Sequence, residues 1–436
     1  MTPHPRLRVL VAAMQEPWPL NGGGRLHLHH VLRTLATHAD VTLLLPEPAR
    51  FPARTPAGVR QVSAGPRLPP VTPRRRRPSD PLDWAARHFG LPAALACWLT
   101  RHGRAYDVIL LNGAVLGQLI RFCPRPVVWN PQDELVLATW RDVETAGWRS
   151  RLAGLRRAVL YAAYERAVAR RAAGTVFVSR VDAAWARRWC GDARLAVIPN
   201  GVDHEYFRPA DRPPHPGTVA FVGSLEFPPN VDAITRFVAE VWPALHAADP
   251  ARRLLIVGRS PGPGVRGLAA VPGVTVHGDV PDVRPFLAQA AVVVVPTRKG
   301  GGLKNKILEA CAVGRPVVVS PRALGGLSAR PGRDLLVAHS AAQWQAHVAR
   351  LLDCPDFAAG LAARGRAWVC AAHTWERTGA QFYALLAAAA GRDAAGGVPE
   401  PRPAAHDRPA AACRLRPRGR PVRGVVRTVA EGLACR

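Results

Sequence analysis

Residues 291–320 read AVVVVPTRKGGGLKNKILEACAVGRPVVVS, and this stretch decides the fold prediction. The continuous apolar run at residues 291–295 predicts a buried parallel strand, and residues 316–320 predict a second one. Between them, a basic glycine-rich loop leads into a helical pattern over residues 303–313. Two parallel strands joined by a helix form a βαβ unit, so the stretch predicts an open α/β sheet.

The same alternation of strand and helix occurs in two series, and a chain of 436 residues suits two domains better than one core. We expect two Rossmann-like domains, over residues 1–198 and 199–373, and a helix over residues 374–390. The predicted strands are residues 7–13, 41–45, 108–111, 127–129, 176–179 and 196–199, then 219–222, 253–257, 274–277, 291–295 and 316–320. Residues 46–81 are rich in Pro and Arg and predict a surface loop, and residues 391–436 predict a disordered basic tail.

The formal net charge of +28 predicts attraction to anionic lipid, nucleic acid or phosphorylated substrates, unless it reflects an arginine-rich compositional bias. The sequence contains no recognisable nucleic-acid module, so no nucleic-acid partner is expected. The eight Cys residues form no CxxC pair, which argues against a metal site and against a disulfide framework. Without a signal peptide or a run of about 20 apolar residues, a cytoplasmic protein with peripheral membrane contact is expected.

The loop before the helix in residues 303–313 has the chemistry of an anion site. Free backbone N–H groups and the positive end of a helix meet the cationic side chains Arg298, Lys304 and Lys306 there. Gly302 and Asn305 belong to the same turn. Glu309 suits hydrogen bonds from ribose hydroxyls, and a site for phosphate and ribose together indicates a nucleotide.

Three further segments support a nucleotide site. Two predicted strands end at Gly223 and Gly258, where a glycine lets a phosphate approach the backbone closely. Another strand runs into Asn200-Gly201, two residue types that tolerate the positive φ of a sharp turn.

The order and spacing of these segments resemble the retaining glycosyltransferases of family 4, which have the GT-B fold, over residues 7–387. The resemblance is strongest to sugar transferases of bacterial exopolysaccharide and PEP-CTERM/exosortase systems. It is carried by FPPNVDA (227–233), GDVPDVRP (278–285), KNKILEA (304–310) and PGRDLLV (331–337).

The resemblance implies how the parts are arranged. The two domains would face a central cleft, and the last helix would cross back to the first domain. Glu309 would contact the donor ribose, and the backbone from Lys304 to Lys306 would hold the diphosphate. The glycine loop, Gly22, Gly23 and Gly24, would face that diphosphate across the cleft.

The sequence departs from the family pattern at several positions. Gly301 occupies the place of the first of the family's paired glutamates, and Ser224 the place of an arginine. We hypothesise that Arg298, Lys304 and Lys306 supply the lost positive charge, so that no metal or other cofactor is needed. Where many members have a histidine after the fourth strand, this chain has Asp133 and Glu134, which suit sugar hydroxyls or helix capping.

The expected function is transfer of a sugar from a nucleotide-diphosphate sugar to a hydroxyl of a glycan or lipid-linked acceptor. Retention at the anomeric carbon and a role in exopolysaccharide or other cell-surface glycan synthesis follow from the resemblance alone. The expected catalytic residues are Glu309, Lys304 and Asp133. Two alternatives remain: a nucleotide-sugar epimerase of the same fold, and a non-catalytic paralogue whose basic tail binds membrane or nucleic acid.

Overall fold

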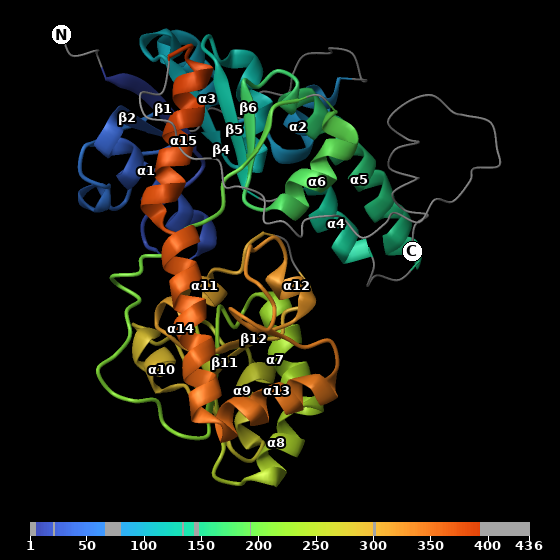
Figure 1. Cartoon of the computed structure of the whole chain (residues 1–436). Coiled ribbons are helices and arrows are strands. Elements are labelled where there is room, and N and C mark those ends of the chain that lie inside the picture. The colour runs from blue at the N-terminus through green and yellow to red at the C-terminus, as the bar shows by residue number, and fades with distance from the viewer. Residues whose placement is uncertain are drawn as a thin grey trace.

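The computed structural model describes residues 6–20, 22–65, 80–132, 135–143, 148–191, 193–299 and 302–392, with the backbone alone at 141–143, 148 and 149. These residues form two α/β domains, one above the other in Figure 1. One domain has a seven-stranded sheet of order β3-β2-β1-β4-β5-β6-β7, and the other a six-stranded sheet of order β10-β9-β8-β11-β12-β13. Every strand pair is parallel, which confirms the predicted pair of Rossmann-like domains.

The N-terminal sheet is buried on both faces, as its continuous apolar strands require. Helix α1 (Gly23–His38) covers one face, and α3 (Ala93–His102) and the 3₁₀ helix η3 (Ala114–Phe122) contribute to the other. The strands are β1 Leu7–Ala13, β2 Ala39–Leu45, β3 Val59–Ser63, β4 Val108–Asn112, β5 Val127–Gln132, β6 Gly174–Phe177 and β7 Leu195–Val197. The remaining helices of this half are α2 Pro81–Phe89, α4 Leu135–Val143, α5 Trp148–Ala169 and α6 Arg180–Cys190, with short 3₁₀ turns η1 Pro52–Arg54 and η2 Gly103–Ala105.

The C-terminal sheet also has an apolar core on each face. Helices α11 (Asn305–Ala312) and α14 (Pro355–Ala372) pack on one face, and α7 (Pro228–Glu240) and α13 (Ala341–Asp353) on the other. The strands are β8 Thr218–Val222, β9 Arg253–Gly258, β10 Val274–Gly278, β11 Val292–Val295, β12 Val317–Val319 and β13 Leu336–Val337. The shorter helices are α8 Trp242–Ala248, α9 Pro263–Gly267, η4 Leu268–Ala270, α10 Arg284–Gln289 and α12 Pro321–Leu324.

Parts of residues 46–81 are packed structure rather than the loop that their composition predicts. Strand β3 pairs in parallel with β2, with Val59 opposite Val41 and Ser63 opposite Leu45, and it forms the edge of the sheet. An edge strand buries less apolar surface, so its sequence signal is weak. The predicted basic loop at Arg74–Arg77 and residues 393–436 of the predicted tail lie outside the described residues.

The last helices connect the two domains. Helix α14 packs against α11 in the C-terminal domain, and α15 (Trp375–Ala389) then packs against α1 in the N-terminal one (Figure 1). Phe382 and Leu386 of α15 are fully buried in the core beside β1. This arrangement confirms the predicted crossing of the final helix back to the first domain.

The two connections between the domains touch one another. Val202, in the first, forms a parallel bridge with Thr374, in the second. A Cβ atom at Gly201 would collide with the backbone of Thr374 and Trp375. The positive φ predicted for Asn200-Gly201 is wrong, because both residues have ordinary backbone angles. Glycine is required here by the close approach of the second chain segment.

Candidate functional site

The N-terminus of α11 lies at the boundary between the two domains. Gly302 has φ 64°, a left-handed conformation that glycine adopts without strain, and it turns the chain into the helix. Among the described residues, no side chain caps the helix at its N-cap, Lys304. An anion could therefore accept hydrogen bonds from the N–H groups of Asn305 and Lys306, which is the kind of site that the sequence predicts.

Lys306 extends from α11 to the end of β8 and the start of α7. Its Nζ donates to Asn230 Oδ1 at 2.9 Å and lies 4.5 Å from the centre of the Phe221 ring. A Cβ at Gly223 would come within 2.5 Å of this Nζ, so the glycine makes room for the lysine. Loss of hydration and the nearby Lys304 lower the pKa of Lys306 to about 7, against the opposing effect of Glu309.

Glu309 lies one turn further along α11 and faces the same region. Burial raises the pKa of its carboxyl to about 7, although Lys306 acts in the opposite direction. A carboxyl group and an ammonium group that both titrate near neutrality, on one helix beside open N–H groups, are typical of a binding site for a charged ligand.

Gly258 and Arg298 were also predicted for the donor site, and their surroundings differ from those of Lys306 and Glu309. A Cβ at Gly258 would collide with the backbone carbonyl of Gly223, so this glycine allows two strand ends to pack closely. Arg298 is exposed and lines a cavity of about 240 Å³ between α7 and α13, together with Arg236 and Trp344.

The glycine loop of the N-terminal domain lies next to the start of α11 in the C-terminal domain. A Cβ at Gly23 would lie 3.9 Å from Asn305 Nδ2, and one at Gly24 would lie 3.1 Å from Gln132 Oε1. Nothing lies within 4 Å of a Cβ built on Gly22. The predicted residues Asp133 and Glu134, which follow Gln132, lie outside the described residues, as does Gly301.

A buried polar network behind the glycine loop was not predicted. Asn130 Nδ2 donates to Asn112 Oδ1 at 2.8 Å and to His27 Nε2 at 2.9 Å. His27 Nδ1 lies 2.9 Å from Asn200 Oδ1, and Asn200 Nδ2 donates to Asn305 Oδ1 at 3.0 Å. Burial lowers the pKa of His27 to about 4, so the ring is neutral at pH 7. Four of these residues are carboxamides, and two of them, Asn112 and Asn130, interrupt the apolar strands β4 and β5, which was the signal that the sequence offered.

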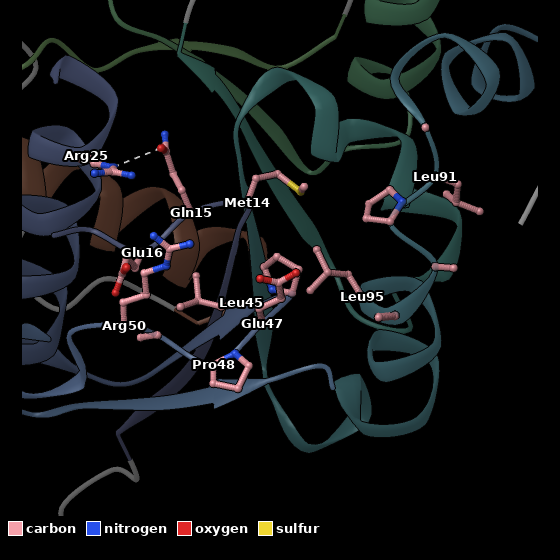
Figure 2. A pocket seen from close by; sticks show the side chains of 16 residues that line it. Met14, Gln15, Glu16, Arg25, Leu45, Glu47, Pro48, Arg50, Leu91 and Leu95 are labelled. Atoms are coloured by element: carbon pink, nitrogen blue, oxygen red, sulfur yellow. Dashed lines mark hydrogen bonds between the residues drawn. The ribbon is translucent and has the colours of Figure 1, made fainter. Parts of the chain in front are cut away.

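A cavity of about 500 Å³ opens beside the glycine loop at the carboxyl ends of β1 and β2 (Figure 2). Polar side chains gather on the wall next to α1, where Arg25 Nε donates to Gln15 Oε1 at 3.2 Å. The opposite wall is apolar and includes Leu91, just before α3, and Leu95 in the first turn of that helix. Met14, which is 46% exposed, lies between the two walls.

Two family models match consecutive parts of the chain. Residues 21–206 match "Glycosyltransferase Family 4", and residues 216–354 match "Glycosyl transferases group 1". The D-inositol 3-phosphate glycosyltransferase of Mycobacterium avium is 31% identical over 213 residues, which is 43% of this chain and 47% of that protein. The chain thus spans about half the length of the curated relative that it matches.

Solved structures share the fold over nearly the whole described chain. Sucrose-phosphate synthase from Thermosynechococcus elongatus has a TM-score of 0.65 at 20% identity, and the match covers 87% of this chain and 98% of the synthase chain. HepE from Anabaena, in complex with UDP and glucose, has a TM-score of 0.62 at 15% identity, and the match covers 87% of this chain and 99% of the HepE chain. The two domains thus have the GT-B fold of these structures, and residues 21–206 and 216–354 each match a family model of glycosyltransferases.

Proposed function

We propose that the protein transfers a sugar, with retention, from a nucleoside-diphosphate sugar to a hydroxyl group of an acceptor. The observation that carries the proposal is the position of the Lys306 ammonium, beside Gly223 and on the helix whose open N-terminus faces Gly23. Relatives named as glycosyltransferases, and a similar fold with UDP and glucose bound, support the same donor class.

The donor diphosphate would lie between the glycine loop and the first turn of α11. Lys306 and Lys304 would neutralise the charge that develops on the departing diphosphate, in a site arranged before the reaction begins. Glu309 would accept hydrogen bonds from the ribose hydroxyls. With these cations in place, we propose that the reaction needs no metal ion.

The acceptor would occupy the 500 Å³ cavity beside the glycine loop. Its polar wall, with Gln15, Glu16 and Arg25, suits a sugar or polyol whose hydroxyl reaches the donor. Its apolar wall, with Leu91 and Leu95, suits a hydrophobic group attached to that sugar. We therefore propose a lipid-linked or similarly substituted acceptor, consistent with exopolysaccharide or other cell-surface glycan synthesis.

Peripheral attachment to anionic membrane would bring the protein to such an acceptor. The net charge of +28 supports this, as do Met14 and Phe51, which are about half exposed near Arg50 at the cavity. No helix in the described part of the chain is long and apolar enough to span a bilayer. Sedimentation with anionic vesicles should show binding that salt weakens, and vesicles that leave the protein in solution at low salt would refute attachment.

The function is tested with purified protein and a panel of UDP-, GDP- and ADP-sugars. A bound donor should raise the melting temperature in proportion to its affinity, and incubation should release free nucleoside diphosphate. Epimerised nucleotide sugar would instead indicate an epimerase, and no thermal shift with any donor would indicate a non-catalytic paralogue. Glu309→Ala is the control for release at this site, and activity that survives EDTA would support independence from metal.

A further inference from the structure

The hydrogen bonds between β5 and α11 have a defined direction. Because the amide group of Asn130 donates to His27, the Nε2 atom of His27 must be the acceptor. The ring proton therefore lies on Nδ1, which donates to the side-chain oxygen of Asn200. This leaves the amide group of Asn200 to donate to the oxygen of Asn305. Each residue fixes the orientation of the next.

The direction matters at Asn305, which is the last residue in this series of hydrogen bonds and the first residue of α11. Its oxygen is occupied by Asn200, so its NH₂ group is directed elsewhere, and a Cβ at Gly23 would lie 3.9 Å from it. The NH₂ group of Asn305 thus lies next to the glycine loop at the N-terminus of α11. The reverse orientation would present an oxygen, which repels phosphate.

His27 is held firmly enough to impose this orientation. Its side chain is buried, and the rings of Trp375 and Phe382 from α15 meet it edge-on at 6.1 and 5.7 Å between centres. Asn130 is fully buried, and among the described residues its Oδ1 has no partner. A buried network of hydrogen-bonded side chains specifies geometry, because breaking one of its bonds leaves polar groups buried without partners.

We propose that His27 and Asn200 are positioning residues that keep the amide NH₂ of Asn305 directed at the donor diphosphate. The inference rests on the proposed donor site at α11. In this proposal His27 and Asn200 touch no substrate. They determine whether Asn305 presents its NH₂ group or its oxygen to the diphosphate.

A double-mutant cycle tests the proposal, with affinities for UDP, GDP and ADP measured beside those for uridine, guanosine and adenosine. His27→Leu should weaken binding of the diphosphates about tenfold, the effect expected for one lost or reversed hydrogen bond, and leave the nucleosides unchanged. In an Asn305→Ala background, His27→Leu should have little further effect, because the group that it orients is gone. His27→Gln, which retains a donor and an acceptor, should restore part of the affinity.

His30→Leu is the matched control. His30 lies on the same helix, is also buried, and stacks on Trp375 at 4.5 Å, but its Nδ1 has no partner among the described residues. This variant should lose stability without a change in the ratio of diphosphate to nucleoside affinity. If His27→Leu weakens nucleosides and diphosphates equally, or acts undiminished in the Asn305→Ala background, its role is only structural and the inference is overturned. A native protein that binds none of the diphosphates would overturn the donor site as well.

Discussion

The Nζ atom of Lys306 lies 2.9 Å from the amide oxygen of Asn230, which joins helix α11 to the start of α7 beside the end of β8. Asn230 is oriented by its own amide group, which donates to the carbonyl oxygen of Ser224 at 2.9 Å. A cation from helix α11 is thereby held next to Gly223. Ser224 stands where the resemblance to family 4 implies an arginine, and the lysine of α11 brings positive charge to the same strand end.

Replacement of Lys306 by Ala should raise the donor KM about 10- to 100-fold. A hydrogen bond between charged groups contributes about 1.5–3 kcal/mol, and the ammonium has no substitute on β8. Lys304→Ala should have a smaller effect in the same direction, because Lys304 is the N-cap of α11 and its backbone remains. Initial rates with a titrated donor sugar give both values.

Arg236→Ala is a suitable control for this loss of charge. Arg236 lies on α7 and forms an exposed ion pair with Glu240 at 2.6 Å, a type of contact that contributes little. The donor KM of Arg236→Ala should stay within about twofold of the native value, because an exposed ion pair contributes little. An unchanged KM for Lys306→Ala would refute the assignment of Lys306 to the diphosphate.

Donor binding should depend on pH on both sides of neutrality. Lys306 has a pKa of about 7 without ligand, so above pH 7 it must take up a proton to bind diphosphate, and affinity should fall up to about tenfold per pH unit. Glu309, also near 7, must lose a proton to accept the ribose hydroxyls, so affinity should fall below pH 7 as well. Calorimetry in buffers of different ionisation enthalpy measures the protons exchanged.

The Lys306→Arg variant separates these two contributions. A guanidinium stays protonated throughout the range, so the alkaline decrease in affinity should disappear while the acid decrease remains. An alkaline decrease that persists in Lys306→Arg would mean that another group is responsible.

Local patterns predicted the elements of the candidate donor site, because each depends on a short stretch of sequence. The strand at residues 7–13 was predicted with the bounds of β1, and the glycine loop and the helix of Glu309 were found from their composition. The side-chain partners were not predicted, since Lys306 and Asn230 are 76 residues apart and meet only after two helices have packed on the sheet.

The same limit explains what was missed at the boundary between the domains. Residues 129–134 lack the histidine that many family members have after the fourth strand, yet a histidine from α1 reaches Asn130 from a position 103 residues earlier. Asn200-Gly201 was interpreted as a turn, although the glycine is required by a segment that lies more than 170 residues further along. Contacts of this kind leave no periodic signal in one sequence.

Met14→Gln should impair acceptors that carry a hydrophobic group and spare the donor. Met14 lies between the polar and apolar walls of the cavity, so a polar side chain there should weaken binding of an alkyl chain by about 1 kcal/mol, roughly fivefold in KM. Octyl and methyl glycosides of glucose, galactose and mannose, compared at saturating donor, measure this. Leu152→Gln on α5 replaces another exposed apolar residue outside the cavity and should change neither class. Equal effects of Met14→Gln on octyl and methyl glycosides would argue against the proposed apolar subsite.

Acid should destabilise the junction between α1, α15 and the connections between the domains. Burial lowers the pKa values of His27 and His373 to about 4 and, with the nearby positive charges of Arg33, His29 and His27, that of His30 to about 3. In the unfolded chain these groups titrate near 6.5, so between pH 6.5 and 4 the unfolded state binds more protons than the folded state. The contribution of these histidines to stability should therefore be complete above pH 6.5 and fall as the pH decreases, by up to about 1.4 kcal/mol per pH unit for each histidine. Urea unfolding at pH 7.5, 6 and 5 measures the slope. His30→Leu should reduce it, because one titrating group is removed, and an identical slope in that variant would show that His30 does not titrate on unfolding in this range.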